Sequence, residues 1–276
     1  MSVDNSTMST HQVYWQPAPP DEPPYPSHNE LQRARVYLEY SPAAKRLFWR
    51  YEGVFPTAIS VMKLPLKRDD LEPYFQPDTE GGGSGTWHDI SQLSITEPKV
   101  SSIEASAYVL AKWESDWFEW HRDHTGDEFN PQYVNYEDLS DEDRPYAEYS
   151  KEDGSWEEDS ETRFLVKCCG QDRPLRKQGI KLLVAGNQFV TIHDYISAVH
   201  PWLMSLREDI VKAKLVARPQ PYSAWEEELM VGEGPEHDIE LKEEWLEGRG
   251  IRRPFTAIQA ASNARILARI RASRGR

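Results

Sequence analysis

Alternating apolar and polar positions in the first quarter of the chain predict short β-strands. In a half-buried strand, successive side chains point to opposite faces, which gives a period of two. This period occurs twice and is followed by a short apolar run; the three segments are residues 33–40, 45–52 and 59–64. We interpret them as a three-strand meander. A helix over residues 42–53, with Ser41 as its N-cap and Gly53 at its end, is the open alternative.

A helical pattern begins at Ser101. Ser101 and Glu104 have the spacing of a capping box, in which the two side chains satisfy free backbone N–H groups of the first turn. From Ile103 to Trp120, apolar residues recur three or four positions apart, which places them on one helical face. We expect this tryptophan-rich face to pack over a sheet, and an aromatic groove for a ligand is the alternative.

A second helix is predicted after Thr191. Thr191 and Asp194 form another capping box, and apolar residues keep to one face as far as Ile210. A proline inside a helix removes one backbone hydrogen bond and crowds the preceding turn. We therefore expect a break at His200, with Pro201 at the first position of the next helix.

Strands are predicted on the N-terminal side of this second helix. Residues 163–168 and 180–185 read as strands, and Gly186-Asn187 predicts a two-residue hairpin turn that returns the chain over residues 189–191. The stretch FVTIHDYISAVHPWL, residues 189–203, resembles a block found in uncharacterised proteins of filamentous fungi. The resemblance implies a lineage, and it assigns no activity and no functional residue.

These patterns together predict an α+β fold, a mostly antiparallel sheet covered by helices. We expect residues 33–64 and 163–191 to form the sheet, and residues 101–121 and 192–214 to form the helices. The chain then divides into a disordered proline-rich tail, an α+β core with one flexible and one acidic excursion, and a helical C-terminal extension that is acidic and then basic. These parts are residues 1–28, 29–216 (with the excursions 65–100 and 125–161) and 217–276.

Charge is unevenly distributed along the chain, whose formal net charge is −14. Residues 114–161 carry a local charge of −15 and residues 226–247 carry −9, whereas residues 249–276 carry eight arginines and no acid. Overall acidity disfavours binding to nucleic acid or to anionic membranes, except through residues 249–276. The chain has no apolar run near 20 residues and a polar start, so we expect an intracellular protein, cytoplasmic or nuclear, without a transmembrane segment.

The basic segment over residues 255–272 has the pattern of an amphipathic helix. We expect Ile266 and Ile270 to pack against the protein while Arg265 and Arg269 face carboxylates, either within the chain or in a second copy. RNA or an acidic membrane surface is the alternative partner of this helix.

One group of residues could bind a metal ion. His121 and His124 lie three positions apart at the end of the tryptophan-rich helix, and Asp127 and Glu128 follow; imidazole and carboxylate groups can hold zinc. The only two cysteines, Cys168 and Cys169, are adjacent at the end of a strand, with one expected to face inward and one outward. Without a CxxC spacing, we assign them neither a redox nor a metal-binding role.

No catalytic motif is complete in this sequence. The glycine run over residues 81–85 is followed by Thr86-Trp87, so a phosphate-binding loop is excluded, and no nucleophile elbow is present. We therefore predict a non-enzymatic protein-binding or scaffold protein that needs no cofactor and has a protein partner. The alternative is a metal-dependent hydrolase that uses His121 and His124 with Asp127 or Glu128.

Overall fold

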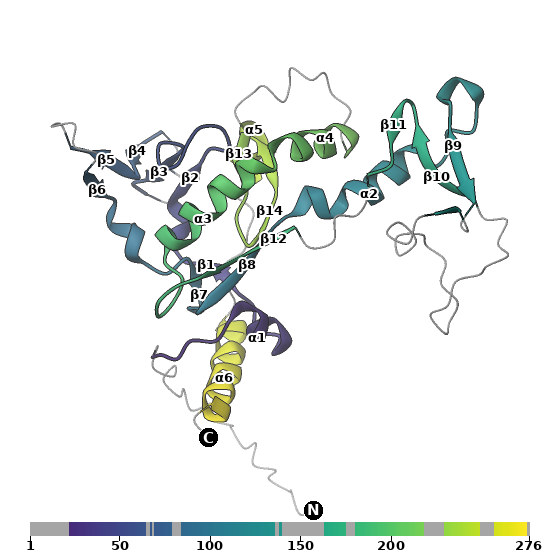
Figure 1. Cartoon of the computed structure of the whole chain (residues 1–276). Helices are drawn as coiled ribbons and strands as arrows, with labels where there is room; N and C mark the ends of the chain where they lie inside the picture. Colours follow the sequence, from purple (N-terminus) through teal and green to yellow (C-terminus); the bar gives the residue numbers. More distant parts are fainter. Residues whose placement is uncertain are drawn as a thin grey trace, which may run out of the picture.

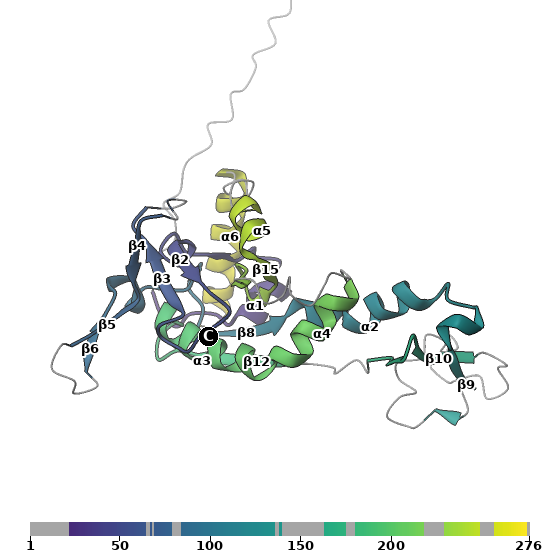
Figure 2. The same ribbon diagram turned by 90° about the horizontal axis from the view of Figure 1, so that it is seen from above.

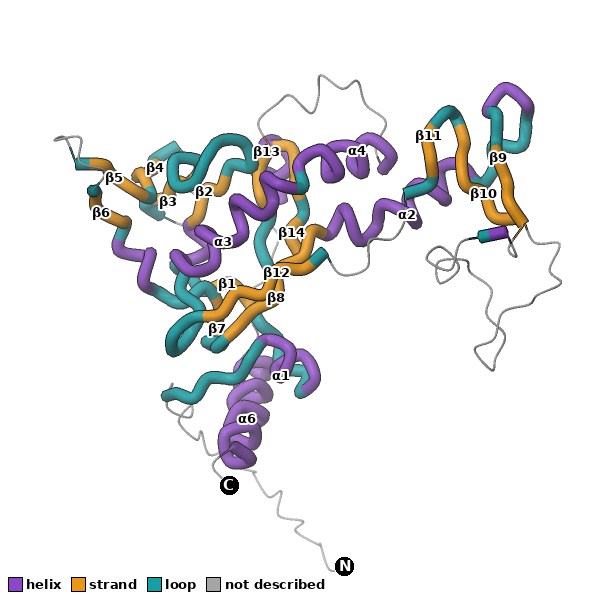
Figure 3. Tube along the Cα trace, in the orientation of Figure 1, coloured by secondary structure: helices purple, strands orange, loops and turns teal. Residues whose placement is uncertain are grey.

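The computed structural model shows an α+β protein with several small, mostly antiparallel sheets (Figures 1 and 3), which confirms the predicted fold class. It describes residues 22–64, 67, 69–78, 84–135, 138–139, 163–174, 180–217, 229–248 and 257–274. Most of the predicted tail, residues 1–21, and most of the acidic excursion lie outside the described residues. Among the described helices, none combines the length and the apolar character needed to cross a bilayer.

The N-terminal sheet differs from the predicted meander in its first strand. Its order is β2-β3-β4, three antiparallel strands formed by Leu47–Trp49, Ile59–Met62 and Leu71–Pro73. Residues 33–40 were wrongly predicted to be a strand. A capping box at Ser27 starts helix α1 (His28–Arg33), and the positive φ of Arg35 turns the chain, so that only Glu39–Tyr40 remain extended as β1.

The predicted helix over residues 42–53 is not formed. Only one 3-10 turn, η1 (Ala44–Arg46), forms there, and it precedes β2. Leu47–Trp49 are extended because they pair with β3, and all three of their side chains are buried. The prediction of a flexible excursion over residues 65–100 is also wrong for most of that range. It contains β4, the β5-β6 hairpin (Phe75–Pro77 and Gly85–Trp87), the turn η2 (Asp89–Gln92) and β7 (Thr96–Glu97), which pairs with β1.

The central sheet has the order β12-β8-β14 and overturns the predicted helix start at Ser101. Its strands are Lys181–Ala185, Ser102–Ala107 and Glu236–His237. In β8, the apolar side chains of Ile103, Ala105 and Ala107 are buried on one face. Pairing on both edges, antiparallel to β12 and parallel to β14, outweighs the local capping signal.

The helix that follows β8 is therefore shorter than predicted. α2 (Tyr108–His121) begins directly after the last residue of β8, with no loop between them. The predicted hairpin from β12 to residues 189–191 is wrong too, because β12 pairs with β8. The backbone N–H of Val190 instead donates to the carbonyl oxygen of Val100 at 2.8 Å.

Two consecutive helices follow: α3 (Ile192–Ser205) packs against β12 of this sheet, and α4 (Arg207–Ala217) packs against α2. The capping box of α3 is confirmed, since the Thr191 hydroxyl accepts a hydrogen bond from the Asp194 N–H at 3.0 Å. The break comes at Leu206, however, and Pro201 lies inside α3. His200 anchors the preceding turn in the core, because it accepts a hydrogen bond from the Trp49 indole (3.0 Å) and donates one to the Gly53 carbonyl (2.9 Å).

The C-terminal part adds a two-stranded sheet and two helices. β13 (Leu229–Val231) pairs with β15 (Ile239–Leu241), so the acidic part of the predicted helical extension contains strands as well as a helix, α5 (Lys242–Gly248). The basic helix is α6 (Ala257–Arg274), and it lies beside α1 in both Figure 1 and Figure 2. Ile266, Leu267 and Ile270 pack against the main hydrophobic core from this helix.

A projecting arm extends from the body of the molecule. We define the arm as α2 together with residues 122–135 and 163–173, which include the turn η3 (Asp127–Phe129) and the strands β9 (Gln132–Asn135), β10 (Arg163–Cys168) and β11 (Gln171–Asp172). α2 leads away from the body and carries the sheet β11-β10-β9 at its far end (Figures 1 and 2). A separate apolar cluster of Trp117, Leu165 and Cys168 joins the helix to this sheet.

Candidate metal centre

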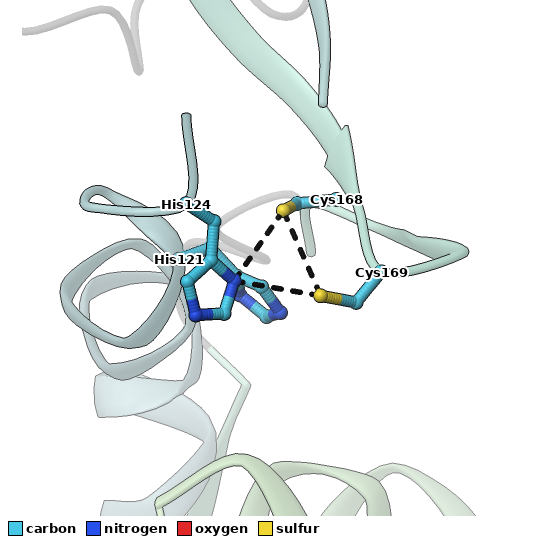
Figure 4. A group of neighbouring side chains, drawn as sticks. All are labelled: His121, His124, Cys168 and Cys169. Atoms are coloured by element: carbon cyan, nitrogen blue, oxygen red, sulfur yellow. Dashed lines mark hydrogen bonds between the residues drawn. The ribbon is translucent and has the colours of Figure 1, made fainter. Parts of the chain in front are cut away.

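Four potential metal ligands meet where the end of α2 faces the β10-β11 turn. We name them the His2Cys2 cluster: His121, His124, Cys168 and Cys169 (Figure 4). Their ligand atoms all lie within 4.8 Å of one another. Of the four, His121 and Cys168 are buried, His124 is half-buried and Cys169 is exposed, so the cluster sits at the edge of the arm's apolar core.

His121 occupies the last turn of α2 in a defined orientation. Its ring packs against Trp117 with centroids 4.4 Å apart, and its Nδ1–H donates to the Trp117 carbonyl oxygen at 2.8 Å. Burial lowers the pKa of His121, more than the hydrogen bond to that carbonyl raises it. The neutral tautomer with the proton on Nδ1 is therefore favoured, which leaves the lone pair of Nε2 free to coordinate a cation.

His124 is oriented by an aromatic neighbour. Its ring stacks on Phe129, with centroids 4.1 Å apart and planes 11° apart. Its Nδ1 lies 3.4 Å from the Cys169 sulfur and 3.7 Å from the Cys168 sulfur. This nitrogen is thus the one that faces the two thiols in Figure 4.

The two cysteines converge because a tight turn follows β10. Cys168 pairs with Gln171 across the hairpin, and the two loop residues, Cys169 and Gly170, both have positive φ, at 51° and 74°. Positive φ at both central positions is the geometry of a type I′ turn, which favours Asn, Asp or Gly over other residues. The turn brings the Cys169 sulfur to 3.9 Å from that of Cys168, whereas consecutive residues of a straight strand would point to opposite faces.

Sequence analysis expected the two cysteine side chains to face opposite sides and, for lack of a CxxC spacing, assigned them no metal-binding role. The expected burial is confirmed, since Cys168 is buried and Cys169 is exposed. The turn nevertheless gathers both sulfurs on one side. A Cys-Gly pair directly after a predicted strand, at a position where Asn-Gly would be ordinary, is the signal that could have revealed it.

Without a bound cation, the electrostatics of the cluster keep the Cys168 thiol protonated. Burial raises the pKa of the Cys168 thiol, and the neighbouring Cys169 raises it further. Two thiolates at this separation repel each other unless a positive charge lies between them, and a coordinating metal ion supplies such a charge.

The predicted acidic ligands are not part of this group. Asp127 and Glu128 lie in η3, both side chains are exposed, and neither belongs to the His2Cys2 cluster. Of the four residues singled out from the sequence, the structure brings together His121 and His124 and combines them with the two cysteines.

A buried ion pair forms a second link between the arm's helix and its sheet. Arg173, just after β11, donates from Nε to the Glu114 carboxylate of α2 at 2.7 Å, and both side chains are about 5% exposed. The guanidinium lies between the rings of Phe118 and Phe164, at 4.6 and 4.1 Å from their centroids. The charge and its aromatic neighbours thus hold the sheet at the middle of α2.

The predicted interaction residues of the basic helix are divided between two environments. Ile266 and Ile270 are half-buried against the core, and Arg265 and Arg269 are exposed. Within the part of the chain that the structure describes, neither arginine forms an ion pair. The carboxylates at residues 226–228 lie outside the described residues, so pairing with that stretch stays a prediction.

Comparisons of this chain with protein-family models, with curated proteins and with solved structures find no match.

Proposed function

We propose that the protein is a non-enzymatic binding protein whose arm recognises a protein partner. The observation that carries this proposal is the outer edge of the arm's sheet. β9 is an edge strand, and no other described strand pairs with its free side. Three of its four side chains are exposed, Tyr133 among them at 41%.

An open edge strand is a ready template for an added strand. Backbone N–H and C=O groups along a free edge can pair with an extended segment of another protein, and alternate side chains then determine specificity. Trp120 on α2 is 52% exposed in the same arm. Tryptophan and tyrosine are the side chains that most often dominate the binding energy of protein interfaces.

Charge indicates the kind of partner. The segment from Glu114 to Glu161, to which most of the arm belongs, carries 18 acidic and three basic residues. We therefore expect an extended segment with lysine or arginine side chains, drawn to the arm by long-range attraction and held by strand pairing.

The competing function is a metal-dependent hydrolase at His121 and His124. A hydrolytic site keeps one coordination position for water, usually beside three protein ligands. The His2Cys2 cluster instead gathers four protein donors, and the carboxylates expected to serve catalysis are outside it. This arrangement supports the binding role.

The test is affinity capture with a matched pair of surface variants. We expect Trp120→Ala with Tyr133→Ala to lose a partner that the unmodified chain captures from its native cells. Leu93→Ala with Leu183→Ala is the control, since these side chains are 49% and 65% exposed but lie outside the arm. With the purified partner, the arm variant should bind at least about 10-fold more weakly. Equal capture by all three proteins would refute recognition through the arm.

A further inference from the structure

We propose that the His2Cys2 cluster binds one zinc ion, which fastens the arm's sheet to the end of α2. The inference does not depend on the binding function proposed above. It rests on donor chemistry, on the separations of the donor atoms, and on the way in which each ligand is held.

The donor set is the one that structural zinc sites use. Two thiolates and two imidazoles form a Cys2His2 site, and zinc in such sites is tetrahedral with no position left for water. Hard cations such as magnesium and calcium prefer oxygen ligands, and the cluster contains none. The chemistry of the donors therefore favours a soft or borderline metal ion. Among such ions, zinc is the one that does not change its oxidation state.

Three of the six donor separations match a tetrahedron of zinc dimensions, and the ligand atom of His121 lies within 4.8 Å of the other three donors. With Zn–S distances of about 2.3 Å and Zn–N distances of about 2.05 Å, a regular tetrahedron has edges of about 3.8 Å between two sulfurs and about 3.6 Å between sulfur and nitrogen. The Cys168 and Cys169 sulfurs are 3.9 Å apart, and the His124 Nδ1 lies 3.7 and 3.4 Å from them. The three measured edges agree with these values to about 0.2 Å, so one ion can contact all three donors.

Each ligand is also held in place by a neighbour. The Trp117 carbonyl fixes the tautomer of His121, and Phe129 supports the ring of His124. The Phe129 carbonyl accepts the backbone N–H of Cys169 at 2.8 Å, which steadies the turn that carries the thiols. Such outer contacts orient metal ligands and reduce the ordering that binding requires.

A backbone feature supports the same conclusion. Cys169 has a positive φ in a turn where a side chain other than Asn, Asp or Gly is disfavoured. Residues held in this region usually serve a purpose that the surrounding structure enforces. Here the conformation turns the Cys169 sulfur toward the histidines. Binding of zinc would displace the protons of the two thiols to solvent and leave one dication coordinated by two thiolates and two neutral imidazoles.

The ion would join parts of the chain that are far apart in sequence. His121 is the last residue of α2 and His124 lies three residues beyond it, whereas the cysteines come some 45 residues later, at the end of β10 and in the turn that follows. The sheet that they fasten meets α2 through only a small apolar cluster, and a small module with a limited core commonly depends on a metal for its stability.

The first experiment measures metal in the full-length chain, purified under reducing conditions. We expect one zinc per chain by elemental analysis. After exchange for Co²⁺, we expect the absorption of a tetrahedral ion together with a thiolate-to-cobalt charge-transfer band whose intensity corresponds to two thiolates. A chain that binds neither ion, or a cobalt spectrum without thiolate bands, would overturn the proposal, even if every variant below failed to fold.

The second experiment assigns the ligands. Cys169→Ser and His124→Gln should each lower zinc affinity by at least about 100-fold, because losing an outer contact alone costs roughly 10- to 100-fold. Asp127→Asn with Glu128→Gln is the matched control from the same arm, and it should bind zinc as tightly as the unmodified chain. Zinc binding that survives both ligand variants, or that is lost in the carboxylate control, would refute the assignment.

Discussion

The imidazole of His237 predicts that the protein loses stability in mild acid. His237 is fully buried in β14. Its Nδ1–H donates to the Gly232 carbonyl oxygen at 3.1 Å, and its Nε2 accepts the hydroxyl of Tyr195 at 2.8 Å. A proton added to Nε2 would remove this acceptor and place a charge in the core. Burial accordingly lowers the pKa of His237 to about 4 from 6.5, and the bond to Gly232 offsets only part of that shift.

The size of the effect follows from the difference between the two pKa values. The unfolded chain takes up the proton near pH 6.5, and the folded chain does so only near pH 4. This contribution to stability is therefore fully present above pH 6.5 and is lost as the pH falls toward 4. At 1.36 kcal/mol per pH unit, the loss is about 2 kcal/mol at pH 5 and about 3 kcal/mol at pH 4.

Urea denaturation of the unmodified chain and of His237→Gln, from pH 7.5 to pH 4, measures this effect. Glutamine is neutral throughout, so the stability of the variant should fall less steeply, and the two curves should converge by about 2 kcal/mol between pH 7 and pH 5. Burial also lowers the pKa values of His200 and His28. Both groups titrate in the unmodified chain and in the variant, so their contributions to the pH dependence of stability cancel in the comparison. Parallel curves would show that the reasoning about His237 is wrong.

Three further predictions, one of them with a control variant, test the packing of the arm and of the helices. Glu114→Gln leaves the buried guanidinium of Arg173 without a carboxylate, so we expect a loss of about 3–5 kcal/mol in denaturation and faster hydrogen exchange in the arm. Ile266→Ser should destabilise the docking of α6 by about 1 kcal/mol and speed hydrogen exchange there, whereas Arg269→Gln should leave exchange unchanged. Thr191→Ala removes the N-cap acceptor of α3 and should lower thermal stability by about 1 kcal/mol; no change in melting would contradict the role of this cap.

The parts of the fold that the sequence predicts correctly are those in which local signals agree with tertiary contacts. The capping box at Thr191 and the apolar face that follows it locate α3, and the β-branched run over residues 59–64 locates β3. The capping box at Ser101 was misleading, because the local signal for a helix competes there with strand pairing to β12 and β14. Both partner strands lie far away in the sequence, so the residues next to Ser101 alone cannot predict this pairing.

The candidate metal centre was half visible in the sequence for a related reason. His121 ends α2 and His124 follows only three residues later, so their closeness in the sequence already places them together. Cys168 and Cys169 join them only through the fold of the arm, and the thiols share a side only because of the φ values at Cys169 and Gly170. A pattern of residue types records neither long-range packing nor the sign of a dihedral angle. The sequence therefore suggested the nearest carboxylates, Asp127 and Glu128, as the remaining metal ligands in place of the two cysteines.

The direct passage from β8 into α2 has a mechanical consequence. Because Ala107 ends the strand and Tyr108 begins the helix, no hinge separates the arm from the sheet. A pull on the arm along the strand direction therefore acts on the five residue pairs between β8 and β12 and on the packing of α4 against α2. A partner bound at the far end of the arm would thus transmit tension into the centre of the protein, where these two contacts resist it.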